Sequence, residues 1–146
     1  MLARRALVVM TFVNGPAYFQ ESDRLSDREK IECYKREVDD MVKLRAAACA
    51  LDTFNTPLNR ARAPLFAQAV REYNDTHPGV NFGFFLLLDL PRAGPSAWAD
   101  PEAVHACFRE IKNPAYATMN GAYVIGTWHG EQFDAAWWRR LSDLFV

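Results

Sequence analysis

The sequence lacks the motifs that mark the commonest nucleotide, metal and disulfide sites. Neither GxGxxG nor GxxxxGK[ST] occurs, so the phosphate-binding glycine loops of nucleotide-binding folds are missing. The three cysteines, Cys33, Cys49 and Cys107, are widely spaced and odd in number. They offer neither the close spacing of metal ligands nor a complete disulfide framework. The sequence therefore predicts no metal site.

The chain also lacks an excess of positive charge and any long apolar run. Its 17 Lys and Arg residues against 18 Asp and Glu give a formal net charge of −1. Nucleic acid and anionic membranes both require a basic surface, so we expect neither as a partner. No apolar run is long enough to span a membrane. Residues 1–13 contain two arginines followed by a short apolar run, 6–13, which leads into Asn14-Gly15-Pro16 without a small-residue cleavage site. We expect a first strand there rather than an export signal, with the cytoplasm as the default location.

The 146 residues are enough for one domain with a sizeable core, which we expect over residues 1–146. Half of the residues are hydrophobic and 24% are charged, as in an ordinary globular protein. Ten Phe and four Trp are many for this length. They serve either core packing or, at the surface, stacking against the apolar faces of sugar rings.

The most informative stretch is residues 81–91, which reads NFGFFLLLDLP. It is almost continuously apolar, without the alternation of a half-buried strand, and it is too short for a buried helix. Such a run is typical of a parallel strand that is buried on both faces. In parallel α/β sheets, chemistry lies just beyond the carboxyl ends of the strands. Asp89 stands at that end and is the first candidate site residue.

The other segments alternate between strand and helix patterns, and Ser26 and Glu29 have the capping-box spacing that marks a helix start. No segment suggests a hairpin, so we expect an α/β fold with four consecutive βα units and a parallel sheet in the order 1-2-3-4. The expected elements are strand 6–13, helix 27–48, strand 50–57, helix 65–73, strand 81–91, helix 101–111, strand 122–128 and helix 133–145.

Two architectures fit this order of elements. A section of a (β/α)8 barrel has sequentially ordered strands, whereas a flavodoxin-like open sheet has the order 2-1-3-4. Periodicity alone does not separate them. In either case the polar residues at the strand ends share one rim of the sheet. These residues are Thr11, Asn14, Asn55, Asp89, Trp128, His129 and Glu131.

Asp89 and Glu131 are the candidate catalytic pair. Neighbouring strands lie about 4.8 Å apart, so the two carboxylates can approach the roughly 5–9 Å separation of glycosidase pairs. In such a pair one carboxyl donates a proton and the other stays ionised. Ordinary structural roles compete with this interpretation. Asp89 could cap the turn before Pro91, Glu131 suits the first turn of a helix, and His129 is an ordinary loop residue. Asp52 falls near the start of its expected strand, away from the rim, and is interpreted as structural.

Several segments together resemble glycoside hydrolase family 71, the fungal and bacterial endo-1,3-α-glucanases. Residues 46–54, AAACALDTF, resemble the family's AxxAGIDAFxLN segment, and residues 11–15, TFVNG, are similar to its first strand, HFMVGN. Residues 84–89, FFLLLD, resemble its FxLSFDM strand. Residues 113–116, NPAY, followed by residues 121–130, GAYVIGTWHG, resemble HPAYxxxxGKPVVSTFxG. The order and spacing of these segments agree over nearly the whole chain.

The resemblance implies a barrel hydrolase of α-glucan that works without a metal or cofactor, in a family that is often extracellular. Asp89 corresponds to the aspartate of the family's third strand. The chain departs from the family at Thr11, where the family has His, and at Cys49-Ala50, where it has Ala-Gly. Four βα units are half of the eight in a full barrel, so we expect the amino-terminal half of a barrel, in a truncated or partial enzyme.

The sequence thus predicts a half-barrel glycoside hydrolase that acts on a polysaccharide or oligosaccharide. Asn14, Asn55 and His129 are expected to bind substrate hydroxyls, and Trp128 to stack on a sugar ring. Two alternatives remain: a non-catalytic carbohydrate-binding remnant and a flavodoxin-like interaction module. A half-barrel leaves two sheet edges open, so we also expect a second copy or a larger parent chain to complete it.

Overall fold

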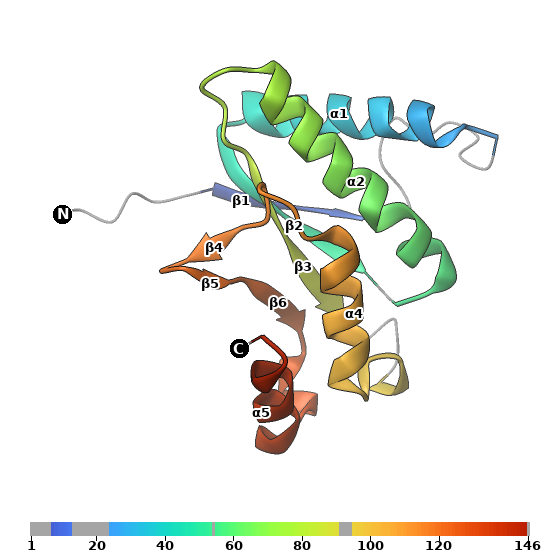
Figure 1. Ribbon diagram of the computed structural model, residues 1–146, viewed down its shortest axis with the longest axis vertical. Helices are drawn as coiled ribbons and strands as arrows, with labels where there is room; N and C mark the ends of the chain where they lie inside the picture. Colours follow the sequence, from blue (N-terminus) through green and yellow to red (C-terminus); the bar gives the residue numbers. More distant parts are fainter. Residues whose placement is uncertain (1–6, 13–23, 54, 91–94, 146) are drawn as a thin grey trace.

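The computed structural model describes residues 7–12, 24–53, 55–90 and 95–145. The described residues alternate between strands and helices (Figure 1), as expected for an α/β fold. In chain order the elements are β1 (Leu7–Phe12), α1 (Asp27–Lys43), β2 (Ala46–Thr53), α2 (Pro57–Thr76), β3 (Gly83–Asp89), η1 (Pro95–Trp98), α4 (Pro101–Ile111), β4 (Thr118–Met119), β5 (Ala122–Tyr123), β6 (Ile125–Trp128), η2 (Gly130–Gln132) and α5 (Ala135–Asp143).

Among the described residues, β1, β2, β3 and β6 form a parallel sheet in that order. The prediction of a parallel sheet with sequentially ordered strands is therefore confirmed. Right-handed crossovers between strands that always advance in one direction place every connecting helix on the same face of the sheet. The helices accordingly pack in sequence, α1 against α2, α2 against α4 and α4 against α5 (Figure 1).

The core lies between the sheet and this layer of helices. Cys49 and Leu51 of β2 and Leu86 and Leu88 of β3 point into it and are fully buried. Burying each large apolar side chain contributes about 1.5–3 kcal/mol. A chain of edge-to-face aromatic contacts crosses the core, with ring centroids 5.0–6.1 Å apart. It runs through Tyr34, Phe66, Phe84, Tyr116 and Phe108. The buried strand expected at residues 81–91 is thus confirmed as β3.

The opposite face of the sheet, which we call the open face, is covered by none of the described helices. Register partners in a parallel sheet share a face, so the open face carries Val8, Met10, Ala48, Ala50, Asp52, Phe85, Leu87, Asp89, Gly126 and Trp128. Val8 and Met10 on the edge strand are 47% and 42% exposed, whereas Ala50 and Leu87 in the middle are buried. On the open face, the side chains in the middle of the sheet are therefore buried, whereas those along β1 are exposed to solvent.

Helix α1 ends five residues earlier than expected, and this moves the next strand. The helix stops at Lys43 instead of residue 48, because Arg45 adopts a left-handed conformation with φ of 62°. Alanines favour helix locally, but Ala46 pairs with β1, and residues 48–50 pair with β1 on one side and β3 on the other. Strand β2 consequently spans Ala46–Thr53 rather than residues 50–57.

The expectation that the chain holds no hairpin is wrong. Strands β4 and β5 pair antiparallel through Asn120-Gly121, both with positive φ (53° and 84°). An Asn-Gly pair is the usual sequence of a two-residue turn that needs φ > 0 at both positions. The single strand expected at residues 122–128 is therefore divided into β5, which belongs to the hairpin, and β6, which joins the sheet.

Candidate functional site

Asp89 and Trp128 lie side by side at the carboxyl end of the parallel sheet. Asp89 is the last residue of β3, and its register partner across the ladder is Trp128, the last residue of β6. Both side chains therefore point to the open face. The Asp89 side chain is buried at 6% exposure, whereas Trp128 is 49% exposed. The rim thus presents a sheltered carboxylate beside an accessible aromatic ring.

Asp52 joins this rim, although the sequence interpretation placed it at the opposite end of its strand. With β2 at Ala46–Thr53, Asp52 is next to the carboxyl end, is 1% exposed and pairs in register with Leu87. Leu87 and Asp89 are two residues apart, so all three side chains share the open face. A lateral spacing of about 4.8 Å and a rise of about 6.6 Å place the Cα atoms of Asp52 and Asp89 roughly 8 Å apart. The structure therefore brings two buried aspartates together.

The sequence did not indicate that Asp52 lies at the carboxyl end of its strand, because four alanines at 46–48 and 50 precede it. Their helix propensity shifted the expected strand by four residues. The Leu-Asp-Thr segment at 51–53, apolar and then polar before Pro57, repeats the Leu-Asp ending of β3. That repetition is the signal that could have placed Asp52 at the rim.

His129 and Glu131 lie in the loop that follows β6. The Nδ1 atom of His129 is 2.9 Å from Oε1 of Glu131, and both side chains are largely exposed. Hydrogen bonds from the Glu131 backbone and from His129 lower the pKa of the Glu131 carboxyl, which favours its ionised form. Gly130 between them is required by space, because a Cβ there would lie 2.4 Å from Oγ1 of Thr127.

Asn55 is held by two hydrogen bonds to neighbouring segments. Its Nδ2 donates to the carbonyl of Ala97 over 2.7 Å, and its Oδ1 accepts from Nη1 of Arg60 over 3.3 Å. The amide thereby joins the start of α2 to η1, the segment that follows β3. Binding of substrate hydroxyls by Asn55 remains a prediction that requires these contacts to be exchanged. Asn14, the other amide expected at the rim, lies outside the described residues.

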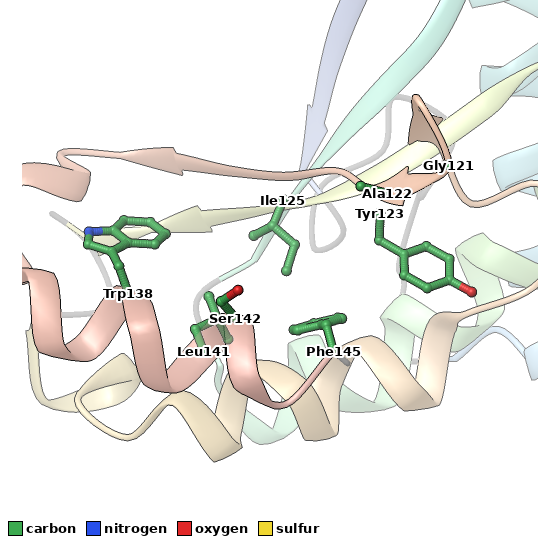
Figure 2. A pocket seen from close by; sticks show the side chains of 8 residues that line it. All are labelled: Gly121, Ala122, Tyr123, Ile125, Trp138, Leu141, Ser142 and Phe145. Atoms are coloured by element: carbon green, nitrogen blue, oxygen red, sulfur yellow. The ribbon is translucent and has the colours of Figure 1, made fainter.

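Two hollows flank the last strand and helix. One of about 310 Å³ is lined by Ala99, Gln132, Phe133, Asp134 and Trp137. It belongs to the segments that follow β3 and β6 and hence to the same end of the sheet as Asp89. The other, of about 470 Å³, lies between α5 and the strands β5 and β6 (Figure 2). Its lining is mainly apolar, with Tyr123, Ile125, Trp138, Leu141 and Phe145 facing it.

The described residues contain no group of three or more His, Cys, Asp or Glu side chains arranged to hold a metal ion. Within the same residues, no helix combines the length and apolar character needed to cross a membrane. No family model, curated protein or solved structure matches the chain. The chemistry of the rim therefore has to be inferred from its own residues.

Proposed function

We propose that this chain is a glycoside hydrolase domain of the family 71 type, built as half of a (β/α)8 barrel and acting on an α-glucan. The observation that carries the proposal is the pairing of buried Asp89 with exposed Trp128 at the carboxyl end of the sheet. An indole face suits the apolar face of a pyranose ring. A carboxylate on the neighbouring strand is then in place to act on the glycosidic bond.

The sheet topology supports a barrel section over an open sheet. The described strands are ordered sequentially and the described helices pack in sequence on one face, as in a barrel. A flavodoxin-like sheet would have the order 2-1-3-4 and helices on both faces. The barrel interpretation also agrees with the segments that resemble family 71, which include residues 46–54 and 84–89.

The proposed reaction uses two carboxyl groups. One protonates the leaving glycosidic oxygen as the bond to the anomeric carbon breaks, and the other assists the addition of water to that carbon. Asp89 is one of the two. Glu131 is the second candidate from the sequence, and its lowered pKa suits the ionised role. Asp52 is the second candidate from the structure, because it shares the open face with Asp89 and lies on the adjacent strand. His129 and Asn55 would bind hydroxyls at the same rim.

Hydrolysis of a 1,3-linked α-gluco-oligosaccharide, followed by the release of reducing ends, tests the proposal. We expect Asp89→Asn to lower the rate at least about 100-fold, the usual contribution of a general acid or base. Asp75→Asn, which changes an exposed aspartate near the end of α2, should leave the rate unchanged. Asp52→Asn and Glu131→Gln identify the second catalytic carboxyl. Only the substitution of the residue that works with Asp89 should lower the rate about as much as Asp89→Asn does. A wild-type chain that releases no reducing ends over the whole pH range contradicts the hydrolase.

A non-catalytic carbohydrate-binding role is the second candidate, and the 49% exposure of Trp128 favours it. In that case the wild-type chain binds the oligosaccharide without cleaving it. Replacing Trp128 by Ala should then weaken binding about tenfold, since the stacking surface is lost. Replacing Asp89 by Asn should have a smaller effect on binding. Isothermal titration with the uncleaved oligosaccharide measures both.

A further inference from the structure

The sheet ends in two strands that pair on one side only within the described residues. β1 pairs with β2 alone and β6 with β3 alone, so each leaves a row of backbone N–H and C=O groups without a neighbouring strand. β1 is also uncharged and apolar, and its Leu7, Val8 and Met10 are 49%, 47% and 42% exposed. A long apolar edge of this kind is a site for pairing with another chain.

An apolar hollow lies at the β6 edge, at the opposite end of the sheet from the apolar β1 edge. Tyr123 and Ile125 lie on one side of the 470 Å³ cavity, and Trp138, Leu141 and Phe145 of the α5 region lie on the other (Figure 2). Tyr123 and Trp138 are 38% and 36% exposed. The space beside β6 and α5 is the place that the next βα unit occupies in a closed barrel.

We propose that a second copy of this chain fills both places, with β1 of each copy pairing parallel to β6 of the other. The proposal rests on the half-barrel architecture of the proposed function and names the partner that completes it. Four parallel strands in sequence from each chain give eight, the number that closes a (β/α)8 barrel. A two-fold axis along the barrel joins the edges β1 to β6 twice, so no open edge remains.

Exposed apolar side chains supply part of the area that a stable dimer buries. Leu7, Val8, Met10, Tyr123 and Trp138 are each 36–49% exposed. At roughly 150–250 Å² for a large side chain, they offer on the order of 400 Å² of apolar area. That is half of the about 800 Å² that each partner buries in a standard interface, before the backbone of the two edges is counted. Val8 and Met10, which this area already includes, are buried because the open face becomes the barrel interior.

The closed dimer also extends the candidate site. All strands of a parallel barrel end at the same mouth, so the Asp89 and Trp128 side chains of both copies share one rim. A glucan chain at the mouth would contact residues of both copies. The site is therefore incomplete in a single chain.

Sedimentation equilibrium of the full chain tests the proposal, and we expect twice the monomer mass. Val8→Asp should abolish the dimer, because it places a charge on the β1 edge inside the interface. Leu58→Asp is the matched control: Leu58 is also 47% exposed, but it lies on α2 away from both edges, so the dimer should persist. Circular dichroism verifies that each variant is folded. A folded wild-type chain at monomer mass overturns the proposal.

Cross-linking distinguishes the β1–β6 pairing from other dimers. In a Cys33→Ala background, chains with Val9→Cys and chains with Thr127→Cys are mixed and treated with a flexible bismaleimide. Val9 pairs in register with Cys49 and Thr127 with Leu88, so both side chains lie on the helix-facing side of the sheet. We expect covalent dimers at least tenfold more abundant in the mixture than in either chain alone. In the closed barrel the two Val9 positions lie on opposite outer sides, so efficient cross-linking of the Val9→Cys chain alone indicates β1–β1 pairing and overturns the proposal. The assembly is measured without substrate, so absence of glucan hydrolysis in a chain that still dimerises contradicts only the proposed function.

Discussion

Glu37 is a partly buried carboxyl that links β1 to the helix layer. Its Oε1 accepts a hydrogen bond from Oγ1 of Thr11, and its Oε2 is buried without a hydrogen-bond partner in the part of the chain that the structure describes. Thr11 was expected at the rim, but it points to the helices instead, because its register partner is Leu51. Burial raises the pKa of Glu37, nearby Asp40 raises it further, and the bond from Thr11 opposes the rise.

This raised pKa predicts that the protein becomes less stable as the pH rises above the ordinary carboxyl pKa of 4.5. The folded state then binds the Glu37 proton more tightly than the unfolded state. Its contribution is complete below the unfolded pKa and is lost as the pH rises through the folded pKa. Glu37→Gln keeps the acceptor for Thr11 and removes the titration. We expect its free energy of unfolding to fall less than that of the wild type between pH 4.5 and pH 8.

Urea denaturation at a series of pH values measures this difference. Asp143→Asn, which changes an exposed carboxyl at the end of α5, serves as the control and should keep the wild-type dependence. Equal pH dependence in Glu37→Gln and wild type would show that Glu37 does not cause the change in stability.

Single residues at the rim were predictable where the local pattern alone fixed their position. Asp89 ends an apolar run that is too continuous for anything except a buried strand, so its place at the strand end followed from the sequence. Asp52 was not predictable in this way. Its place depends on where α1 stops, which is fixed by the left-handed Arg45 and by pairing with β1 and β3. Those are tertiary contacts that local propensity does not contain.

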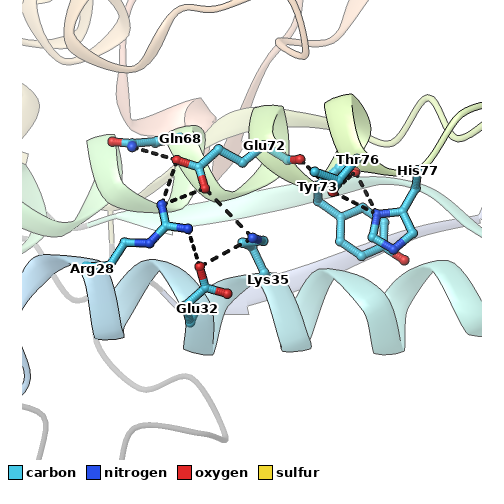
Figure 3. Close-up of polar contacts among 8 residues, drawn as sticks. All are labelled: Arg28, Glu32, Lys35, Gln68, Glu72, Tyr73, Thr76 and His77. Carbon is cyan, nitrogen blue, oxygen red and sulfur yellow. Dashed lines mark hydrogen bonds and ion pairs between the residues drawn. The ribbon is translucent and has the colours of Figure 1, made fainter.

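At the scale of elements, α1 and α2 are joined by a small polar network on their outer surface (Figure 3). Glu72 of α2 accepts a hydrogen bond from Gln68 over 2.8 Å, pairs with Arg28 of α1 at 2.9 Å and lies 3.8 Å from Lys35. These contacts lower the pKa of Glu72, the bond from Gln68 most of all. The pairs are partly solvent-exposed, so each contributes at most about 1 kcal/mol.

The start of α1 is held by the capping box that the sequence predicts. The Ser26 N–H donates to Oε2 of Glu29 over 2.7 Å, and the Glu29 N–H donates to Oγ of Ser26 over 3.3 Å. Replacing Ser26 by Ala removes the acceptor for this N–H, so we expect the free energy of unfolding to fall by about 1 kcal/mol. Urea denaturation measures the change. Ser142→Ala near the end of α5 is the control. Only the carbonyl of Ser142 takes part in the C-cap and alanine retains it, so the stability should change by less than about 0.5 kcal/mol.

Elements were therefore predictable where caps and periodicity agreed, as for the start of α1 and for α4, and β3 was predictable from its continuous apolar run. The hairpin was missed for a different reason from the boundary of β2. Asn120-Gly121 carried the turn signal, but its flanking strands are only two residues long, too short for alternation to be recognised. The hairpin forms because Thr118 and Tyr123 pair beside Phe84 and Tyr116, which anchor the segment to the sheet.

At the scale of the whole molecule, sequential strand order is the property from which the rest follows. It places the helices on one face, gathers the strand ends into one rim and leaves β1 and β6 as edges. Periodicity could not supply that order, because strand patterns are identical in a barrel section and in an open sheet. The pattern of one segment likewise does not predict how the sheet edges are covered, because the edges are β1 and β6, which are distant in sequence.

Closure by a second copy makes the stability of the whole molecule depend on its concentration. Dissociation accompanies unfolding, so mass action shifts the thermal midpoint with protein concentration. Each tenfold dilution reduces the stabilisation that association adds at that concentration by about 1.4 kcal/mol per dimer, which lowers the midpoint by about 2–3 °C for a dimer of this size. Calorimetry over a hundredfold range of concentration measures it. The Val8→Asp chain should show a lower midpoint that does not change with concentration, and the Leu58→Asp chain should follow the wild type. A wild-type midpoint that stays constant over the whole range would mean that the edges β1 and β6 are stable without a partner.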